Sequence, residues 1–197
     1  MTGPDDASTR PALVIISGPP GAGKSSLAAA ISKELRLAML AKDMFKEAIF
    51  DHLPGVDTSD AHRLGIASVG MMYAFARTQL ENGVGIILES TFDRGKAEED
   101  VGPLLAMASA VIVHCTAPDA LILERYEERA DDADRHEVHR DEEHVDALKQ
   151  NLVAGIYEPM DLDIPLIEVD MTDPEAVDER DLIIRIRTIL EEGVAKG

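Results

Sequence analysis

The chain has 197 residues, which is long enough for one α/β domain with a substantial core and too short for two domains of ordinary size. Its formal net charge of −19 disfavours a nucleic-acid partner, because an acidic surface repels a phosphate polymer, and an aromatic content of 4% without Trp argues against a base-stacking platform. No apolar run approaches the roughly 20 residues of a membrane span, and the polar start at 1–11 predicts a disordered leader, so we expect a cytoplasmic protein with a single domain over residues 12–197.

The first predicted element is a buried parallel strand at 12–16, and the loop after it matches the phosphate-binding pattern G-x-x-x-x-G-K-[ST] at every fixed position. Glycines suit such a loop because its backbone turns N–H groups toward phosphate oxygens through conformations that a Cβ hinders. Helical spacing follows from Leu27 to Leu35, so the order is strand, loop, helix, with the anion at the helix N-terminus. The alternative is a turn rich in Gly and Pro with a chance lysine.

This loop is predicted to bind a nucleoside triphosphate. Lys24 can reach the β- and γ-phosphates, and the Ser25 hydroxyl can hold Mg²⁺. The predicted nucleotide-binding residues here are Gly18, Pro19, Pro20, Gly21, Ala22, Gly23, Lys24, Ser25 and Ser26.

A second strand at 37–41 leads into a helix over 42–50 with one apolar side. Asp43 lies at the junction, where it either caps the helix or faces the phosphate loop. Lys46 lies one turn further on and either contacts an acceptor molecule or is solvated.

After a break at 53–59, Asp60 can start a longer helix, whose apolar residues at helical spacing are Leu64, Ala67, Met71, Met72 and Phe75. Methionine in such a stripe is more often a core residue than a cofactor contact, so we expect this face to pack on the core. The helix should end near Asn82-Gly83, because Gly is typical of a helix C-terminus.

A third strand is predicted at 84–88, and it delivers Glu89 to its carboxyl end, where an open parallel sheet binds ligands. Glu89 could hold a water of the Mg²⁺ shell or orient an acceptor, and Asp93 is a weaker candidate. A helix around 96–107 follows, and Gly102-Pro103 should break or bend it early.

The fourth strand is predicted at 110–115, and its Cys115, the single cysteine, is interpreted as a buried thiol. The helix after it becomes almost wholly charged from 124 to 140; this run is either a solvated helical face or an arginine-bearing phosphate clamp. A fifth strand at 165–170 and a final amphipathic helix from Leu182 to Leu190 complete the pattern. Strands that alternate with helices predict an α/β fold of three layers with right-handed crossovers.

The sequence resembles the P-loop kinases of small molecules, in particular the zeta-toxin-like and chloramphenicol-phosphotransferase-like group with a small AAA-type ATPase domain. The resemblance covers about 13–190 and rests on the phosphate loop, on 41–47 and 87–92, and on the arginines of 125–140. It implies a five-stranded parallel sheet in the order 2-3-1-4-5 and makes 124–140 a mobile lid over the triphosphate.

The resemblance also implies roles for the lid and for the loop after the fifth strand. Arg125 would neighbour the adenine, Arg129 and Arg135 would bind phosphate, and Arg140 is a further candidate. Thr172 and Pro174 would belong to the loop that flanks the adenine.

Phosphoryl transfer needs positioning and positive charge, and a carboxylate near the γ-phosphate serves as base or orienting group for the acceptor hydroxyl. Asp43 lies where similar small-molecule kinases carry such an aspartate. The predicted catalytic residues are Lys24, Asp43, Arg129 and Arg135, and the predicted metal-site residues are Ser25 and, through water, Glu89.

We therefore expect an ATP- and Mg²⁺-dependent kinase, a monomer or homodimer, that phosphorylates a hydroxyl of a metabolite, sugar or antibiotic. The alternatives are a regulatory ATPase or switch without an acceptor and, less favoured, a polynucleotide 5′-hydroxyl kinase. An enclosed polar cavity between Asp43, Lys46 and the helix from Asp60 would favour the kinase. Acceptor specificity should reside within 44–75 and 91–96, where no pattern names a molecule.

Overall fold

The computed structural model describes residues 10–133, 135–139 and 141–195. Residues 1–9 of the predicted leader and the candidate Arg140 therefore lie outside the described residues. Within the described part, Arg10 donates hydrogen bonds to the carbonyls of Leu105 and Ala106. No helix among the described residues is both long enough and apolar enough to cross a bilayer.

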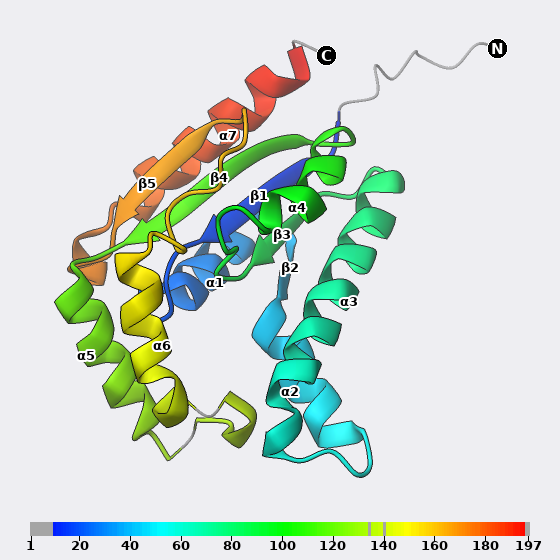
Figure 1. Cartoon of the computed structure of the whole chain (residues 1–197). Coiled ribbons are helices and arrows are strands. Elements are labelled where there is room, and N and C mark those ends of the chain that lie inside the picture. The colour runs from blue at the N-terminus through cyan, green and yellow to red at the C-terminus, as the bar shows by residue number, and fades with distance from the viewer. Residues whose placement is uncertain (1–9, 134, 140, 196–197) are drawn as a thin grey trace.

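The order of elements alternates strands with helices along most of the chain (Figure 1). The strands are β1 (Ala12–Ser17), β2 (Ala38–Ala41), β3 (Ile86–Glu89), β4 (Ser109–Thr116) and β5 (Leu166–Asp170). The α-helices are α1 (Lys24–Leu35), α2 (Lys42–His52), α3 (Ala61–Glu81), α4 (Ala97–Leu105), α5 (Asp119–Ala130), α6 (Asp141–Val153) and α7 (Glu179–Ala195). Three short 3-10 helices are η1 (Thr58–Asp60), η2 (Glu137–His139) and η3 (Pro174–Ala176).

All five strands are parallel and lie in the order β2-β3-β1-β4-β5, which confirms the predicted sheet. Ile15 at the middle of β1 pairs with Leu88 on β3 and with Ile112 on β4. The connection after β1 leads toward the β2 edge, whereas the connection after β4 leads toward the β5 edge. The switch point beside the carboxyl end of β1 is where ligands bind in such sheets, and the phosphate loop begins there.

Side chains alternate between the two faces of the sheet, as the period of a strand requires. Val14 and Ile16 of β1 pack in a buried cluster with α1 and α7. Leu13 and Ile15 pack on the other face with α3 and α4. The fold is therefore a sheet between two helical layers, and its apolar strands hold the carboxyl ends in place.

Two predictions about α3 and its end have different outcomes. The helix ends where expected, because the N–H of Val84 bonds to the carbonyl of Gln79 at 2.9 Å and Gly83 adopts a φ of 73°. These contacts keep Val84 in the C-terminal turn, so β3 starts at Ile86 and not at 84. The predicted core stripe was partly wrong, since Leu64 and Met72 are buried whereas Met71 is 39% and Phe75 is 50% exposed.

The predicted early break in the fourth helix was also wrong. α4 continues through Gly102 and Pro103 to Leu105. Val101 and Leu104 are buried on the core, and this burial holds the helical turn that contains the proline. Pro103 has no N–H to donate to the carbonyl four residues earlier, so the helix lacks one backbone hydrogen bond there and the burial of Val101 and Leu104 offsets that loss.

At the carboxyl ends of the strands, α5 and α6 form one arm and α2 with the adjoining part of α3 form another (Figure 1). The segment around η2 crosses from the first arm to the second. Its Val138 is fully buried and packs with Ala61 and Leu64 of α3. The predicted lid region thus consists of the end of α5 and the segment through η2, with its tip packed on α3.

Candidate active site

The phosphate loop joins β1 to α1 and turns through left-handed conformations that glycine favours. Gly21 has a φ of 85° and Gly23 a φ of 83°. A Cβ on Gly21 would lie 2.7 Å from the carbonyl oxygen of Ile122 on α5, too close for the backbone to accommodate. Any other residue at Gly21 would therefore displace the loop or α5. The glycines therefore form a cradle in which the loop backbone can closely approach a phosphate group.

Lys24 begins α1, and its ammonium lies inside the loop. Its Nζ donates to the carbonyl of Pro19 at 2.8 Å, and the side chain is 8% exposed. Burial lowers the pKa of Lys24, and the nearby carboxylate of Glu89 opposes that shift. The geometry therefore places an ammonium where an anion held by the loop would meet it.

Ser25 and Glu89 lie together beside the loop. The Ser25 hydroxyl donates to Oε2 of Glu89 at 3.4 Å, and Glu89 is 6% exposed at the end of β3. Burial raises the pKa of Glu89, and the charge of Lys24 opposes that shift. A hydroxyl and a carboxylate side by side are the oxygen ligands that Mg²⁺ prefers, so this corner fits the predicted metal site.

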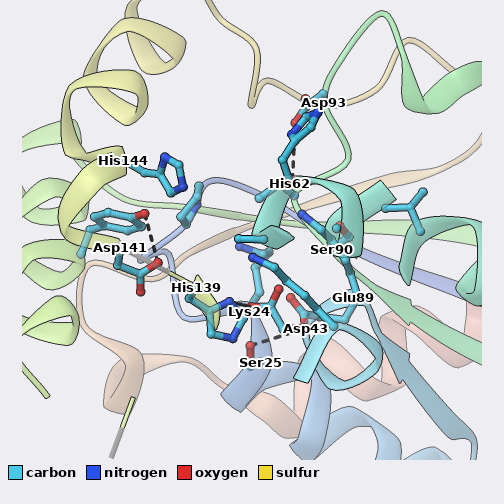
Figure 2. Close-up of a pocket in the computed structure, with 18 of the residues that line it drawn as sticks. Lys24, Ser25, Asp43, His62, Glu89, Ser90, Asp93, His139, Asp141 and His144 are labelled. Carbon is cyan, nitrogen blue, oxygen red and sulfur yellow. Dashed lines mark hydrogen bonds and ion pairs between the residues drawn. The ribbon is translucent and has the colours of Figure 1, made fainter. Parts of the chain in front are cut away.

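Asp43 does not cap α2, because the helix begins at Lys42 and its N-cap is Ala41. The cap interpretation is therefore wrong, and Asp43 lies in the first turn with its carboxylate beside the phosphate loop (Figure 2). Its Oδ2 is 3.9 Å from a terminal nitrogen of Arg135 and 3.9 Å from Nδ1 of His139.

Two of the predicted lid arginines converge on one carboxylate, that of Asp141 at the start of α6. Oδ2 of Asp141 accepts from Nε of Arg129 at 3.1 Å and from Nε of Arg135 at 2.7 Å. Oδ1 accepts from the Tyr126 hydroxyl at 3.1 Å. Burial raises the pKa of Asp141, but the hydrogen bond from Arg135 and the charges of both arginines outweigh it, and the net shift is downward.

The tip of the lid is tied to α2 by histidines. Nε2 of His139 donates to Oε1 of Glu47 at 2.6 Å, and Nε2 of His136 lies 3.1 Å from Oδ1 of Asp51. Burial lowers the pKa of His139, and Asp43 and Glu47 oppose that shift. These contacts and the burial of Val138 hold the lid against α2 and α3.

Arg125 lies apart from the other arginines, at the loop after β5. Its guanidinium donates to the carbonyls of Met171 at 2.9 Å and Thr172 at 3.0 Å. Thr172 is exposed, and η3 begins two residues later at Pro174. The structure thus brings together the residues predicted to surround the adenine, although their role stays a prediction.

A cavity of about 650 Å³ opens between the phosphate loop, the lid and the α2–α3 arm. Figure 2 shows Lys24, Ser25, Asp43 and Glu89 gathered in it, with Asp141 and His144 on one side and His62, Ser90 and Asp93 on the other. Its lining also includes Lys42 and, within the ranges predicted to set acceptor specificity, the following residues of α2, α3 and the β3–α4 loop: Lys46, Gly65, Ile66, Val69, Thr91 and Lys96.

The predicted catalytic and metal-site residues all line this single cavity: Lys24, Ser25, Asp43, Glu89, Arg129 and Arg135. Sequence reasoning missed Asp141 and gave no catalytic or binding role to His139. No pattern in the sequence marks Asp141, because it is one more acid after a highly charged run. Only the folded structure shows that it is buried between two arginines.

Comparison with known proteins shows which family the chain belongs to. A family model described as an AAA domain matches residues 13–154. A "putative kinase" from Chloroflexus aurantiacus has 33% sequence identity, with 92% of this chain and 99% of that chain covered and a TM-score of 0.82. No curated protein matches the chain.

Other solved structures share the fold at lower identity. Kti12 from Chaetomium thermophilum, in complex with ADP-AlF3, has 18% identity and a TM-score of 0.64, with 90% of this chain and 98% of that chain covered. Shikimate kinase from Bacteroides thetaiotaomicron has 16% identity and a TM-score of 0.56, with 91% and 98% covered. These two similarities concern the fold alone.

Proposed function

Because the chain belongs to the AAA domain family, we propose that it is a kinase that transfers the γ-phosphoryl group of ATP, with Mg²⁺, to a hydroxyl of a small molecule. The observation that carries the proposal is the cavity, which joins the phosphate loop to Asp43 and to two lid arginines and continues along α3. It offers room for an acceptor beside the position of the transferred group.

The residues of the loop fit the nucleotide. The glycine conformations leave the backbone close to the ligand, and Lys24 supplies a positive charge at the β- and γ-phosphates. Ser25 and Glu89 would hold Mg²⁺, directly and through water. The metal, when bound, neutralises charge on the phosphate oxygens.

In the proposed reaction the acceptor oxygen forms a bond to the γ-phosphorus while the bond from that phosphorus to the ADP oxygen breaks. Asp43 takes the proton of the hydroxyl, so the products are ADP and a phosphate ester. The position of Asp43 in the cavity, at the first turn of α2, supports this role.

The lid arginines would stabilise the transferring charge. Asp141 holds Arg129 and Arg135 through their Nε atoms, and among the described residues no group accepts a hydrogen bond from the terminal nitrogens of Arg129. A guanidinium that is held through its Nε keeps N–H groups on its terminal nitrogens that can donate to phosphoryl oxygens. Asp141 is thus a positioning residue for both arginines.

The regulatory ATPase or switch and, less favoured, the polynucleotide 5′-hydroxyl kinase are the alternatives. The cavity is open on one side and not the enclosed one that would favour the kinase, and the proposal is supported by the charged side chains that line it beside the loop. Several finer predictions belong with the proposal: membership of the zeta-toxin-like or chloramphenicol-phosphotransferase-like group, the use of Mg²⁺, a cytoplasmic location, and a monomeric or homodimeric state.

The test is ADP release by the purified protein with Mg²⁺-ATP and a panel of sugars, antibiotics, nucleosides and hydroxy acids. We expect acceptor-dependent turnover that Lys24→Ala abolishes and that Asp43→Asn lowers by about a hundredfold, as loss of a general base does. Asp163→Asn, at an exposed aspartate after α6, is the matched control and should leave turnover unchanged. Slow hydrolysis that no acceptor stimulates would favour the switch, and unchanged turnover in Asp43→Asn would remove that residue as the base.

A further inference from the structure

The cavity has the opposite charge balance to the whole chain. The chain carries 38 Asp and Glu against 19 Lys and Arg. Six of the residues lining the cavity are basic, namely Lys24, Lys42, Lys46, Lys96, Arg129 and Arg135, and four are acidic, namely Asp43, Glu89, Asp93 and Asp141. An acidic protein that gathers cations in one cavity concentrates anions there.

The acidic side chains of the cavity already have partners. Asp141 holds the two lid arginines, and Asp93 lies 3.4 Å from Nζ of Lys96. Glu89 accepts from Ser25 and is the carboxylate that most strongly opposes the lowered pKa of Lys24. Among the described residues, these pairs leave Lys42 and Lys46 of α2 as cavity cations whose ammonium groups join no hydrogen bond or ion pair.

Lys46 is the clearest of these. It is 9% exposed, and among the described residues no hydrogen bond or ion pair joins its ammonium. Burial lowers its pKa, the charge of Lys42 adds to that shift, and Asp43 and Asp141 oppose it. A buried ammonium without a partner is unfavourable, and an anion bound in the cavity would relieve that cost.

The helix sets where this anion would lie. Lys42 and Lys46 are four residues apart on α2, so they lie on the same face, and Asp43 is three residues before Lys46. Lys42 also reaches across to α3, since its Cε would be 3.8 Å from a Cβ on Gly65. The two lysines therefore line the α2–α3 side of the cavity, one helical turn from the proposed base.

We propose that the acceptor carries an acid group, a carboxylate or a phosphate ester, which Lys46 binds with the help of Lys42 while its hydroxyl faces Asp43. This inference rests on the proposed function and names the substrate class of the same site. Residues three apart on a helix are about 5–6 Å apart at Cβ, so one small molecule can place its acid group at Lys46 and its hydroxyl at Asp43.

Calorimetry on the protein saturated with Mg²⁺ and a non-hydrolysable ATP analogue tests this assignment without relying on turnover. The probes are two matched series: glycerol, glycerate and glycerol 3-phosphate, then glucose, gluconate and glucose 6-phosphate. We expect at least one anion to bind about tenfold or more tightly than its neutral counterpart, as a charged hydrogen bond provides. The carboxylate and phosphate arms distinguish the two kinds of acid group.

Variants assign the effect to Lys46. Lys46→Met should remove the preference for the anion, Lys46→Arg should retain it, and Lys33→Met, at an exposed lysine of α1, should leave it unchanged. Affinity for the ATP analogue should change little in Lys46→Met.

Three results would overturn the proposal: neutral probes that bind as well as anions, no binding by any anion, or a loss of nucleotide affinity in Lys46→Met as large as the loss of anion affinity. Anion binding without phosphoryl transfer would instead count against the kinase.

Discussion

Asp141→Asn removes the negative charge that holds the lid arginines and leaves the shape of the side chain. The carboxylate accepts from Nε of Arg129, from Nε of Arg135 and from the hydroxyl of Tyr126. Because its pKa is lowered in the folded protein, its contribution to stability is complete at neutral pH and is lost only as pH falls through that lowered pKa.

The magnitude follows from burial. Breaking a buried ion pair costs about 3–5 kcal/mol. The side chain of Asp141 is 6% exposed, but those of Arg135 and Arg129 are 19% and 34% exposed, so solvent screening reduces the cost to about 2–3 kcal/mol. For a chain of this size, that loss corresponds to a fall in Tm of about 4–12 °C.

Thermal unfolding at pH 7, followed by circular dichroism, measures this loss. Asp146→Asn, at an exposed aspartate of the same helix, is the matched control and should change the free energy of unfolding by less than about 0.5 kcal/mol. A Tm for Asp141→Asn that falls no further than that of Asp146→Asn would refute the reasoning, because the carboxylate would then contribute nothing to holding the arginines.

Three further changes test other parts of the account. Gly21→Ala places a Cβ 2.7 Å from the Ile122 carbonyl oxygen at a φ of 85°, which costs at least about 1–2 kcal/mol, and calorimetry should show that Mg²⁺-ATP binding is lost; retained affinity would contradict the glycine cradle. His114 has its pKa lowered by burial from 6.5 to about 4, so the free energy of unfolding should fall by about 3 kcal/mol as pH drops through that interval. Urea unfolding should show that the free energy of unfolding depends less on pH in His114→Gln, where groups such as His139 account for the remaining dependence. A pH profile identical to that of the unaltered protein would exclude the His114 ring as the source of the effect. Arg125→Met should weaken ATP binding about tenfold and leave inorganic triphosphate binding unchanged, and equal losses would place Arg125 away from the adenine.

The sheet could be predicted because its signals are local and strong. The strands are short apolar runs, and the glycines of the phosphate loop mark the turn from β1 into α1. The order of the strands came from resemblance to a family, since hydrophobic periodicity alone does not say which strands are neighbours.

The position of the lid could be predicted from the sequence, but the ion pairs that its arginines form could not. The charged run at 124–140 pointed to arginines, yet which acid holds them depends on how α5 and α6 meet, and Asp141 lies just beyond that run. In the same way, the spacing of α3 could not separate the buried Met72 from the exposed Phe75, because the face that a helix buries is set by its partners.

Calorimetric titration of Mg²⁺-ATP into the folded chain tests most directly whether the loop at 18–25 binds a triphosphate. The account predicts one saturable site per chain, with affinity at least about tenfold lower in Lys24→Ala, whose circular dichroism should match that of the unaltered protein. An absence of binding heat from well-folded protein, or equal affinity in the two proteins, would contradict it.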